Sequence, residues 1–214
     1  MMANEVELIA HRAGNRAGGP DAVRAVADTI ELDLRLERGR MVVRHPRRIW
    51  LTDRLWEKWY LLPPGTPSMS FEEAAAAVDD DLHLWIDCKG IGRRLPERAV
   101  GTTAARDRVT VSSKAWWMLA PVTGREDVRV IRSVSNRLEL AALRFFPSRV
   151  EVDGVVAHSR LLDKGLVTAL KGRYGLLFSW SIPDAALGRR LAAWGVNGLI
   201  IDDPEVMDEL RRRS

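Results

Sequence analysis

Short apolar stretches alternate with helix-like stretches along almost the whole chain. Eight segments are rich in apolar and β-branched residues and are bounded by turn residues, as buried strands are. These segments are Val6–Ala10, Thr29–Leu36, His83–Cys88, Val109–Ser112, Val128–Ser133, Gly154–Ala157, Leu176–Trp180 and Gly198–Ile201. A shorter apolar run, Met41–Val43, follows Gly39 and is expected to fold back as a hairpin.

The segments between these runs carry the spacing of amphipathic helices. They are Asp21–Ala27, Phe71–Val78, Leu95–Arg106, Ala115–Val122, Leu138–Phe145, Lys164–Arg173, Asp184–Trp194 and Pro204–Arg212. Asp184 and Asp203 stand where helix N-caps are expected, and Gly195 lies just past a helix end.

Alternating strands and helices predict parallel strands joined by crossover helices, an α/β fold. Eight such units indicate a (β/α)8 TIM barrel, a fold of about 250 residues in typical cases. The chain has 214 residues, so we expect a compact barrel forming one domain over residues 1–214. An open doubly wound sheet is the alternative, but no glycine-rich phosphate turn follows the first strand.

Composition excludes several classes of protein. Hydrophobic residues make up 46% and charged residues 29%, which rules out a disordered chain. No apolar run approaches the roughly 20 residues of a membrane span, and the first residues lack a secretory pattern. Cys88 is the single cysteine and cannot form an internal disulfide, so we expect a cytoplasmic location.

The net charge of +4 arises mostly from arginine. Acidic and basic residues are interspersed, and no basic stripe with interleaved aromatics or known motif is present. Nucleic acid is therefore not an expected partner.

Acidic residues within apolar strands are the most informative feature. In the segment from Thr29 to Leu36, Glu31 and Asp33 share the face opposite the apolar one, and residues i and i+2 lie about 6.6 to 6.8 Å apart. Asp87 falls at the carboxyl end of another strand, where barrel active sites lie. Three carboxylates there would form an oxygen site suited to Mg²⁺ or Ca²⁺.

The same residues have a simpler interpretation. Glu31 and Asp33 could form a solvated face, and Asp87 and Lys89 an ordinary ion pair. However, charges in a central apolar strand cost several kcal/mol unless they are paired or bound to a metal. This cost favours a functional cluster.

Two of the four histidines fall at strand ends. His11 follows the first strand and His45 follows the run Met41–Val43. Because imidazoles titrate near neutrality, two of them beside a metal-carboxylate cluster can move protons in phosphoryl transfer. Arg12 and Lys89 could hold anionic oxygens, whereas His83 and His158 are expected to be structural.

An ordered set of short motifs covers nearly the whole chain and resembles the glycerophosphodiester phosphodiesterase family. The motifs are His11-Arg12, Glu31-x-Asp33, His45 after a Val-Val strand, Asp87-x-Lys89, Pro67 to Glu73, Val109 to Ser113, Ser179-Trp180-Ser181-Ile182, and Trp194 to Pro204. A TIM barrel is the fold that this resemblance implies. It also implies His11 and His45 as the acid/base pair, Glu31, Asp33 and Asp87 as ligands of a divalent metal, and Arg12, Lys89 and Trp180 as substrate contacts.

The reaction implied by the resemblance is attack of an adjacent substrate hydroxyl on phosphorus. It gives a cyclic phosphate, which is then hydrolysed. The expected substrates are small-molecule or lipid-headgroup phosphodiesters, such as glycerophosphodiesters or lysophospholipid-like compounds.

The chain departs from the family pattern at several points. The stretch from His11 to Glu31 is short, His45-Pro46 replaces the usual His-Asp pair, and Asp87 replaces the usual glutamate. These departures keep two alternatives open. One is a sphingomyelinase D or lysophospholipase D-like phospholipase, and the other is a catalytically inactive barrel that binds phosphorylated ligands.

Tryptophans crowd the stretch after His45. Trp50, Trp56 and Trp59 are mixed there with basic residues, a composition that suits peripheral contact with lipid headgroups. The alternative is that these indoles pack as a lid over the barrel mouth.

Overall fold

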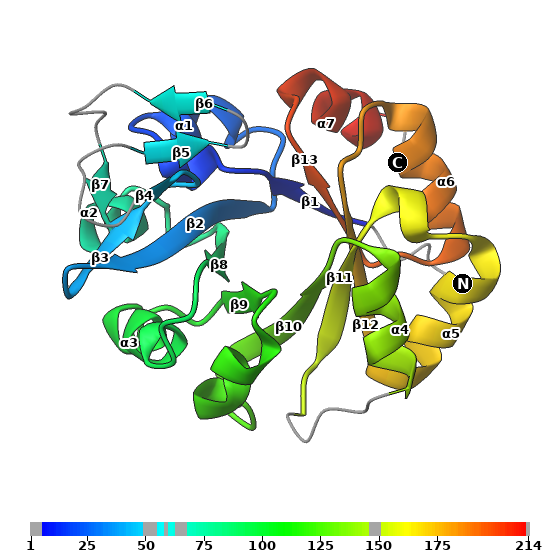
Figure 1. The fold of residues 1–214 in the computed structure, drawn as a ribbon. Helices are drawn as coiled ribbons and strands as arrows, with labels where there is room; N and C mark the ends of the chain where they lie inside the picture. The colour runs from blue at the N-terminus through cyan, green and yellow to red at the C-terminus, as the bar shows by residue number, and fades with distance from the viewer. Residues whose placement is uncertain (1–5, 49–54, 58–59, 63–67, 146–150, 213–214) are drawn as a thin grey trace.

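Eight parallel strands close into a barrel in the computed structural model, which describes residues 6–48, 55–57, 60–62, 68–145 and 151–212 (Figure 1). The strands are β1 (Glu7–Ala10), β2 (Thr29–Glu37), β8 (His83–Cys88), β9 (Val109–Ser113), β10 (Val128–Val134), β11 (Gly154–His158), β12 (Leu176–Trp180) and β13 (Gly198–Ile201). Their order is β1-β13-β12-β11-β10-β9-β8-β2, and pairing of β1 with β2 closes the ring. The expected TIM barrel is confirmed.

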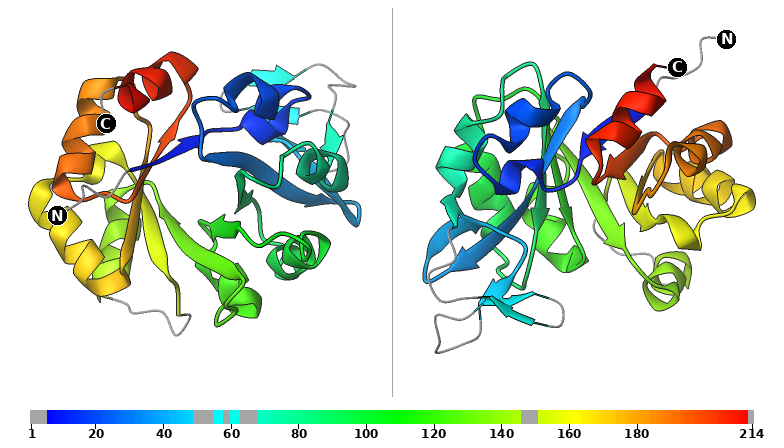
Figure 2. Two further views of the ribbon diagram at one scale, coloured as in Figure 1. Left: turned by 180° about the vertical axis from the view of Figure 1, so that it is seen from behind. Right: turned by 90° about the horizontal axis from the view of Figure 1, so that it is seen from above.

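Helices surround the barrel, and the figures show α4 to α7 covering its C-terminal half (Figures 1 and 2). The α-helices are α1 (Gly19–Val23), α2 (Phe71–Ala76), α3 (Leu95–Thr102), α4 (Arg137–Phe145), α5 (Lys164–Tyr174), α6 (Ala185–Trp194) and α7 (Pro204–Arg211). Asp184 and Asp203 cap α6 and α7 through their side chains, and Gly195 ends α6 at a φ of 99°, as predicted. No helix among the described residues is long and apolar enough to cross a membrane.

One predicted helix is of a different type in the structure, and another has different bounds. The segment expected to be helical over 115–122 is the 3-10 helix η2 (Trp116–Val122), which contains Pro121. Proline lacks the N–H that an α-helix needs at an interior position. The first helix, α1, covers Gly19–Val23 and not the expected Asp21–Ala27, and its five residues agree with the short first loop and helix expected from the stretch between His11 and Glu31.

The two faces of the barrel strands have different partners. Ile30, Leu32 and Leu34 of β2 belong to the apolar layer between strands and helices, as their alternation predicts. A second apolar cluster belongs to the opposite faces of the strands and consists of Ile9, Trp85, Ile131, Val156, Phe178 and Ile200. Glu31 and Asp33, which alternate with the residues packed toward the helices, therefore face the barrel interior.

Short antiparallel strands follow β2. β3 (Arg40–Val43) pairs with β2 as the predicted hairpin, and β7 (Met69–Ser70) pairs with β3. A separate three-stranded sheet, β4–β5–β6 (Arg47–Arg48, Leu55–Glu57 and Tyr60–Leu62), was not predicted and lies at the edge of the molecule near β3 (Figures 1 and 2).

Only one of the three tryptophans assigned to membrane contact lies in the described part of the chain. Trp56 of β5 is 46% exposed, so its indole reaches solvent. Trp50 and Trp59 lie outside the described residues. Membrane contact therefore stays a prediction.

A polar network lies at the end of the barrel where the strands have their amino ends. Arg129 forms a two-pronged ion pair with Glu7 and donates to the Thr110 hydroxyl, which also contacts His83 Nε2 at 2.7 Å. Burial and the nearby Arg129 lower the pKa of His83 to about 4. His83 thus begins β8 far from the carboxyl ends, in a structural setting, as expected.

Replacing Gly154 by alanine is expected to destabilise the barrel. A Cβ there would lie 2.6 Å from the Leu176 carbonyl oxygen and 2.7 Å from the Leu176 Cβ, so backbone would have to move. Overpacking of this kind costs typically about 1–3 kcal/mol. Gly172 in α5 is the matched control, because a Cβ at that position would meet no atom within 4 Å and alanine there favours the helix. Urea unfolding of both variants measures the difference, and equal stability would contradict the close approach.

Stability is expected to fall as the pH is lowered from about 6.5 to 4 because of His83. The unfolded chain binds a proton at the ordinary pKa of about 6.5, whereas the folded protein does so only near 4. The full difference corresponds to at most about 3 kcal/mol, lost progressively in that window and present above it. The check is the unfolding free energy of the wild type and of His83→Gln at several pH values. The unfolding free energy of the wild type minus that of His83→Gln should decrease as the pH falls through this window and become constant below it.

Candidate functional site

A cavity of about 120 Å³ opens at the carboxyl ends of the barrel strands. Its lining combines ionisable groups with a few hydroxyl and apolar side chains. The lining residues are His11, Arg12, Glu31, His45, Trp85, Asp87, Lys89, Ser112, Lys114, Ser133, Val156, Trp180 and Ile200. Seven of the eight site residues expected from the sequence are among them, and the eighth, Asp33, is buried in contact with Arg12 and Lys89.

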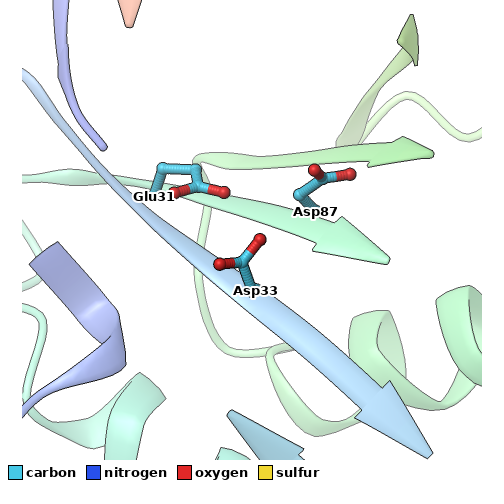
Figure 3. Close-up of side chains that lie close together, drawn as sticks. All are labelled: Glu31, Asp33 and Asp87. Atoms are coloured by element: carbon cyan, nitrogen blue, oxygen red, sulfur yellow. The ribbon is translucent and has the colours of Figure 1, made fainter. Parts of the chain in front are cut away.

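Three carboxylates converge beside this cavity. Glu31 and Asp33 come from β2 and Asp87 from the adjacent strand β8, with Asp33 and Asp87 paired in register. Figure 3 shows the three side chains turned toward one another. Each offers one oxygen, and these oxygens all lie within 4.8 Å of one another.

Asp33 is fully buried and is held from several sides. The Asn15 side chain donates to Asp33 Oδ2 at 2.8 Å and accepts from the Asp33 backbone N–H at 2.8 Å. Lys89 Nζ lies 2.8 Å from Asp33 Oδ1, and Arg12 Nε lies 3.3 Å from Oδ2. Burial opposes ionisation, but these two cations outweigh it and hold the pKa of Asp33 below its usual range.

Glu31 has the opposite electrostatic balance. Burial, reinforced by the charge of Asp33, raises the pKa of Glu31 to about 7. The Arg12 backbone N–H donates to Glu31 Oε2 at 2.6 Å, and Arg12 adopts a φ of 56°, in the left-handed region. Such a conformation costs about 1–3 kcal/mol for a residue other than glycine, so the surrounding contacts must enforce it.

Lys89 links two of the acids. Its ammonium contacts both Asp33 and Asp87, and Ser112 donates its hydroxyl proton to the other Asp87 oxygen at 3.1 Å. Burial disfavours the ammonium, but Asp87, Asp33 and Glu31 together raise the pKa of Lys89 above its ordinary value. The lysine is therefore a fixed positive charge at the base of the site.

The donor set fits a hard divalent cation. Three carboxylate oxygens within 4.8 Å are the ligands that Mg²⁺ and Ca²⁺ prefer. Burial is the main cause of the raised pKa of Glu31, and the charges of Asp33 and Asp87 add to it. A cation held beside these carboxylates would favour their ionised forms. An ion held there would share Asp33 and Asp87 with the Lys89 ammonium.

His11 follows β1 directly and is bonded to a carboxylate across the barrel seam. Its Nδ1 lies 2.6 Å from Oδ1 of Asp202, the residue after β13, and its backbone N–H donates to the Ile201 carbonyl at 2.9 Å. Burial disfavours the imidazolium, but the bond to Asp202 and the charge of Glu31 outweigh it and raise the pKa of His11.

His45 lies after β3 and has a carboxylate partner of its own. Its Nδ1 is 2.7 Å from Oε1 and 2.9 Å from Oε2 of Glu57, a residue of β5. Burial is the largest influence and lowers the pKa of His45 below its ordinary value, against the opposing effect of Glu57. The two histidines of the site are thus shifted in opposite directions.

Trp180 forms the wall of the cavity away from the carboxylates. Its ring packs against His158 at a centroid distance of 4.4 Å, and Lys114 Nζ lies 5.7 Å from its centroid. The indole N–H donates to the Val134 carbonyl at 3.4 Å, which fixes the ring plane. His158 also accepts the backbone N–H of Arg160 through Nδ1, a structural contact of the kind expected for it.

Four residues that contact the predicted set were not identified from the sequence: Asn15, Glu57, Ser112 and Asp202. Asp202 lies inside the motif Trp194 to Pro204 and directly follows the strand β13, at the end of the barrel where the cavity opens. This position is a signal that could have identified it. Ser112 has the same kind of signal, since it lies in the motif Val109 to Ser113 near the carboxyl end of a strand. Asn15 and Glu57 have no such signal, because their roles depend on contacts between segments.

The chain is similar to known proteins in structure and not detectably in sequence. No family model and no curated protein matches the sequence. A glycerophosphodiester phosphodiesterase of Thermotoga maritima is similar with a TM-score of 0.75 and 18% identity, covering 96% of this chain and 98% of that one. A phosphodiesterase of Oleispira antarctica, solved with the product sn-glycerol-3-phosphate, has a TM-score of 0.74 and 15% identity, covering 96% of both chains.

A third similar structure is a glycerophosphodiester phosphodiesterase of Parabacteroides distasonis, with a TM-score of 0.70 and 19% identity over 98% of each chain. The TM-scores of 0.70 to 0.75 over nearly the whole chain establish a shared fold, and identities below 20% limit the conclusion to the fold. The resemblance seen in the sequence is therefore confirmed at the level of the fold. The chain is a compact TIM barrel with the architecture of the glycerophosphodiester phosphodiesterases.

Proposed function

We propose that the protein is a metal-dependent phosphodiesterase that cleaves glycerophosphodiesters through two histidines. The observation that carries this proposal is that His11 and His45 line one cavity beside the carboxylate cluster of Glu31, Asp33 and Asp87. The similar structures support it, since they are phosphodiesterases and one holds sn-glycerol-3-phosphate. The single buried cysteine, Cys88, supports a reducing, cytoplasmic setting.

The charge of the cavity suits a phosphodiester monoanion. With all three acids ionised and Arg12 and Lys89 protonated, the cluster carries one net negative charge, and a divalent cation makes it net positive. A bound Mg²⁺ or Ca²⁺ supplies charge stabilisation for the phosphoryl oxygens. Arg12, whose guanidinium lies beside Asp33, and Lys89 then provide donors for the remaining oxygens.

The opposite pKa shifts support different tasks for the two histidines in this proposal. His45, whose pKa is lowered, is neutral near pH 7 and takes the proton from the glycerol hydroxyl next to the phosphate. That oxygen bonds to phosphorus and the bond to the headgroup oxygen breaks, giving a cyclic phosphate. His11, whose pKa is raised, gives its proton to the departing oxygen. Hydrolysis of the cyclic phosphate reverses these transfers with water as the nucleophile.

Lysophospholipid-like diesters share the same reacting group and form the second substrate class to be tested. The alternative of an inactive binding barrel would be favoured by an Asp87 that fails to reach the other acids or by a blocked mouth. Asp87 lies in the cluster and the cavity is present, which supports the catalytic interpretation.

Replacing either histidine by alanine is expected to lower kcat by about 10²- to 10⁴-fold, the usual contribution of a proton-transfer group. The leaving group separates their roles. A glycerophosphate ester of p-nitrophenol needs no protonation on departure, so it should restore turnover in His11→Ala and not in His45→Ala. His83→Gln, at the opposite end of the barrel, is the control and should retain activity. Full activity of His11→Ala on glycerophosphoglycerol would exclude the mechanism.

Removal of divalent metal is expected to abolish hydrolysis, and Mg²⁺ or Ca²⁺ to restore it. Asp87→Asn should weaken metal affinity by about tenfold or more, because a ligand charge is lost. Asp127→Asn is the control, since Asp127 is an exposed partner of Arg125. Calorimetric titration of the metal-free protein measures affinity directly. Hydrolysis that persists in EDTA would contradict the proposal.

A further inference from the structure

The residue after His45 has a side chain that cannot form a hydrogen bond, yet the His45 imidazole has a carboxylate partner. Pro46 carries no side-chain donor or acceptor. The partner is Glu57, twelve positions further along, whose two carboxylate oxygens lie 2.7 and 2.9 Å from His45 Nδ1. The carboxylate therefore comes from the sheet β4–β5–β6 and not from the strand that carries His45.

Strand geometry accounts for the direction of Glu57. Leu55 and Glu57 share one face of β5, and Trp56 lies on the other. Leu55 is 3% exposed, the Glu57 side chain 12% and Trp56 46%. β5 is paired on both sides, with β4 and with β6, so its faces cannot rotate independently. Burial of Leu55 thus holds Glu57 toward the barrel.

The backbone of His45 is fixed by a separate set of bonds. Arg35 of β2 donates to the His45 carbonyl through Nε at 3.1 Å and Nη2 at 2.8 Å. The preceding residue, Arg44, donates its backbone N–H to the Asp33 carbonyl at 2.9 Å. These bonds hold the backbone but do not restrict rotation of the imidazole about the side-chain bonds of His45. The contact with Glu57 restricts that rotation.

The same contact selects a tautomer. An ionised carboxylate only accepts hydrogen bonds, so His45 Nδ1 must carry the proton. In the neutral ring the other nitrogen, Nε2, then bears the lone pair. His45 lines the cavity, so this is the form needed to take a proton from a substrate hydroxyl there.

We infer that Glu57 is the positioning residue for His45, and that the sheet β4–β5–β6 is a working part of the site because it supplies this carboxylate. The kinetic consequence rests on the proposed function. The tautomer and orientation of His45 are properties of the protein alone and are tested without substrate.

The first experiment measures the ¹⁵N–¹H correlations of the histidine side chains at about pH 8, where neutral rings show their tautomer. Only four histidines contribute signals. The wild type should show His45 protonated at Nδ1. Glu57→Gln should lose this preference, because an amide can accept or donate. The His83 signal, from the opposite end of the barrel, reports whether the variant is folded.

Glu37→Gln is the matched control. Glu37 is also 12% exposed and also ion-paired, but its partner is Arg44 and not a histidine. This variant should leave the His45 tautomer as it is in the wild type.

The second experiment measures hydrolysis of glycerophosphoglycerol with metal present. Glu57→Gln should lower kcat by about 10- to 100-fold while KM changes little, since substrate binding does not involve Glu57. Glu57→Asp should recover part of kcat, because it keeps the carboxylate. Glu37→Gln should retain wild-type kcat.

An unchanged His45 tautomer in folded Glu57→Gln would overturn the inference, as would an altered tautomer with wild-type kcat. An equal loss of kcat in Glu37→Gln would also overturn it, since any broken ion pair would then suffice. A wild type that hydrolyses none of the diesters contradicts the proposed function, while the spectra still decide whether Glu57 fixes His45.

Discussion

The burial of like charges inside a closed barrel is the constraint on which the site depends. Asp33 has no exposed surface, and Glu31 is 2% exposed beside it. Such a pair is stable only if opposite charge is placed within contact distance, and Lys89 and Arg12 provide it. The pairing of β2 with β8 adds Asp87 at the level of Asp33. Register, and not local sequence, therefore sets how much negative charge gathers at this point.

Closure of the barrel completes the arrangement of the histidines. β1 pairs with β13 on one side and with β2 on the other, so the first and last strands meet at a seam. His11 and Asp202 lie on opposite sides of this seam and bond across it. His45 similarly receives its carboxylate from β5, which belongs to another sheet. A partly folded chain that lacks the seam or the small sheet would carry the same residues without their partners.

The parts of the structure that follow local periodicity could be predicted from the sequence. The eight barrel strands are continuous buried runs, and the alternation around Glu31 and Asp33 places both acids on the inner face. The seven-residue 3-10 helix η2 was predicted as an α-helix because its apolar spacing alone does not register the effect of Pro121.

The contacts of Asn15 and Glu57 could not be predicted. Asn15 acts through two bonds to Asp33, eighteen positions away, which depend on how a short loop folds. Glu57 depends on antiparallel pairing within a Trp-rich stretch that has no clear period. In both cases tertiary packing, and not propensity or spacing, determines the partner.

The two histidine–carboxylate pairs differ in their access to solvent. The Asp202 side chain is 70% exposed, whereas that of Glu57 is 12% exposed. At physiological ionic strength, dissolved ions screen interactions between exposed charges that lie more than about 8 Å apart, and they affect buried pairs much less. Both contacts are much shorter than this distance, so the pairs differ mainly in the hydration of their carboxylates and little in their response to dissolved ions. The protein thus joins one histidine whose carboxylate partner is open to water with another whose partner is largely covered.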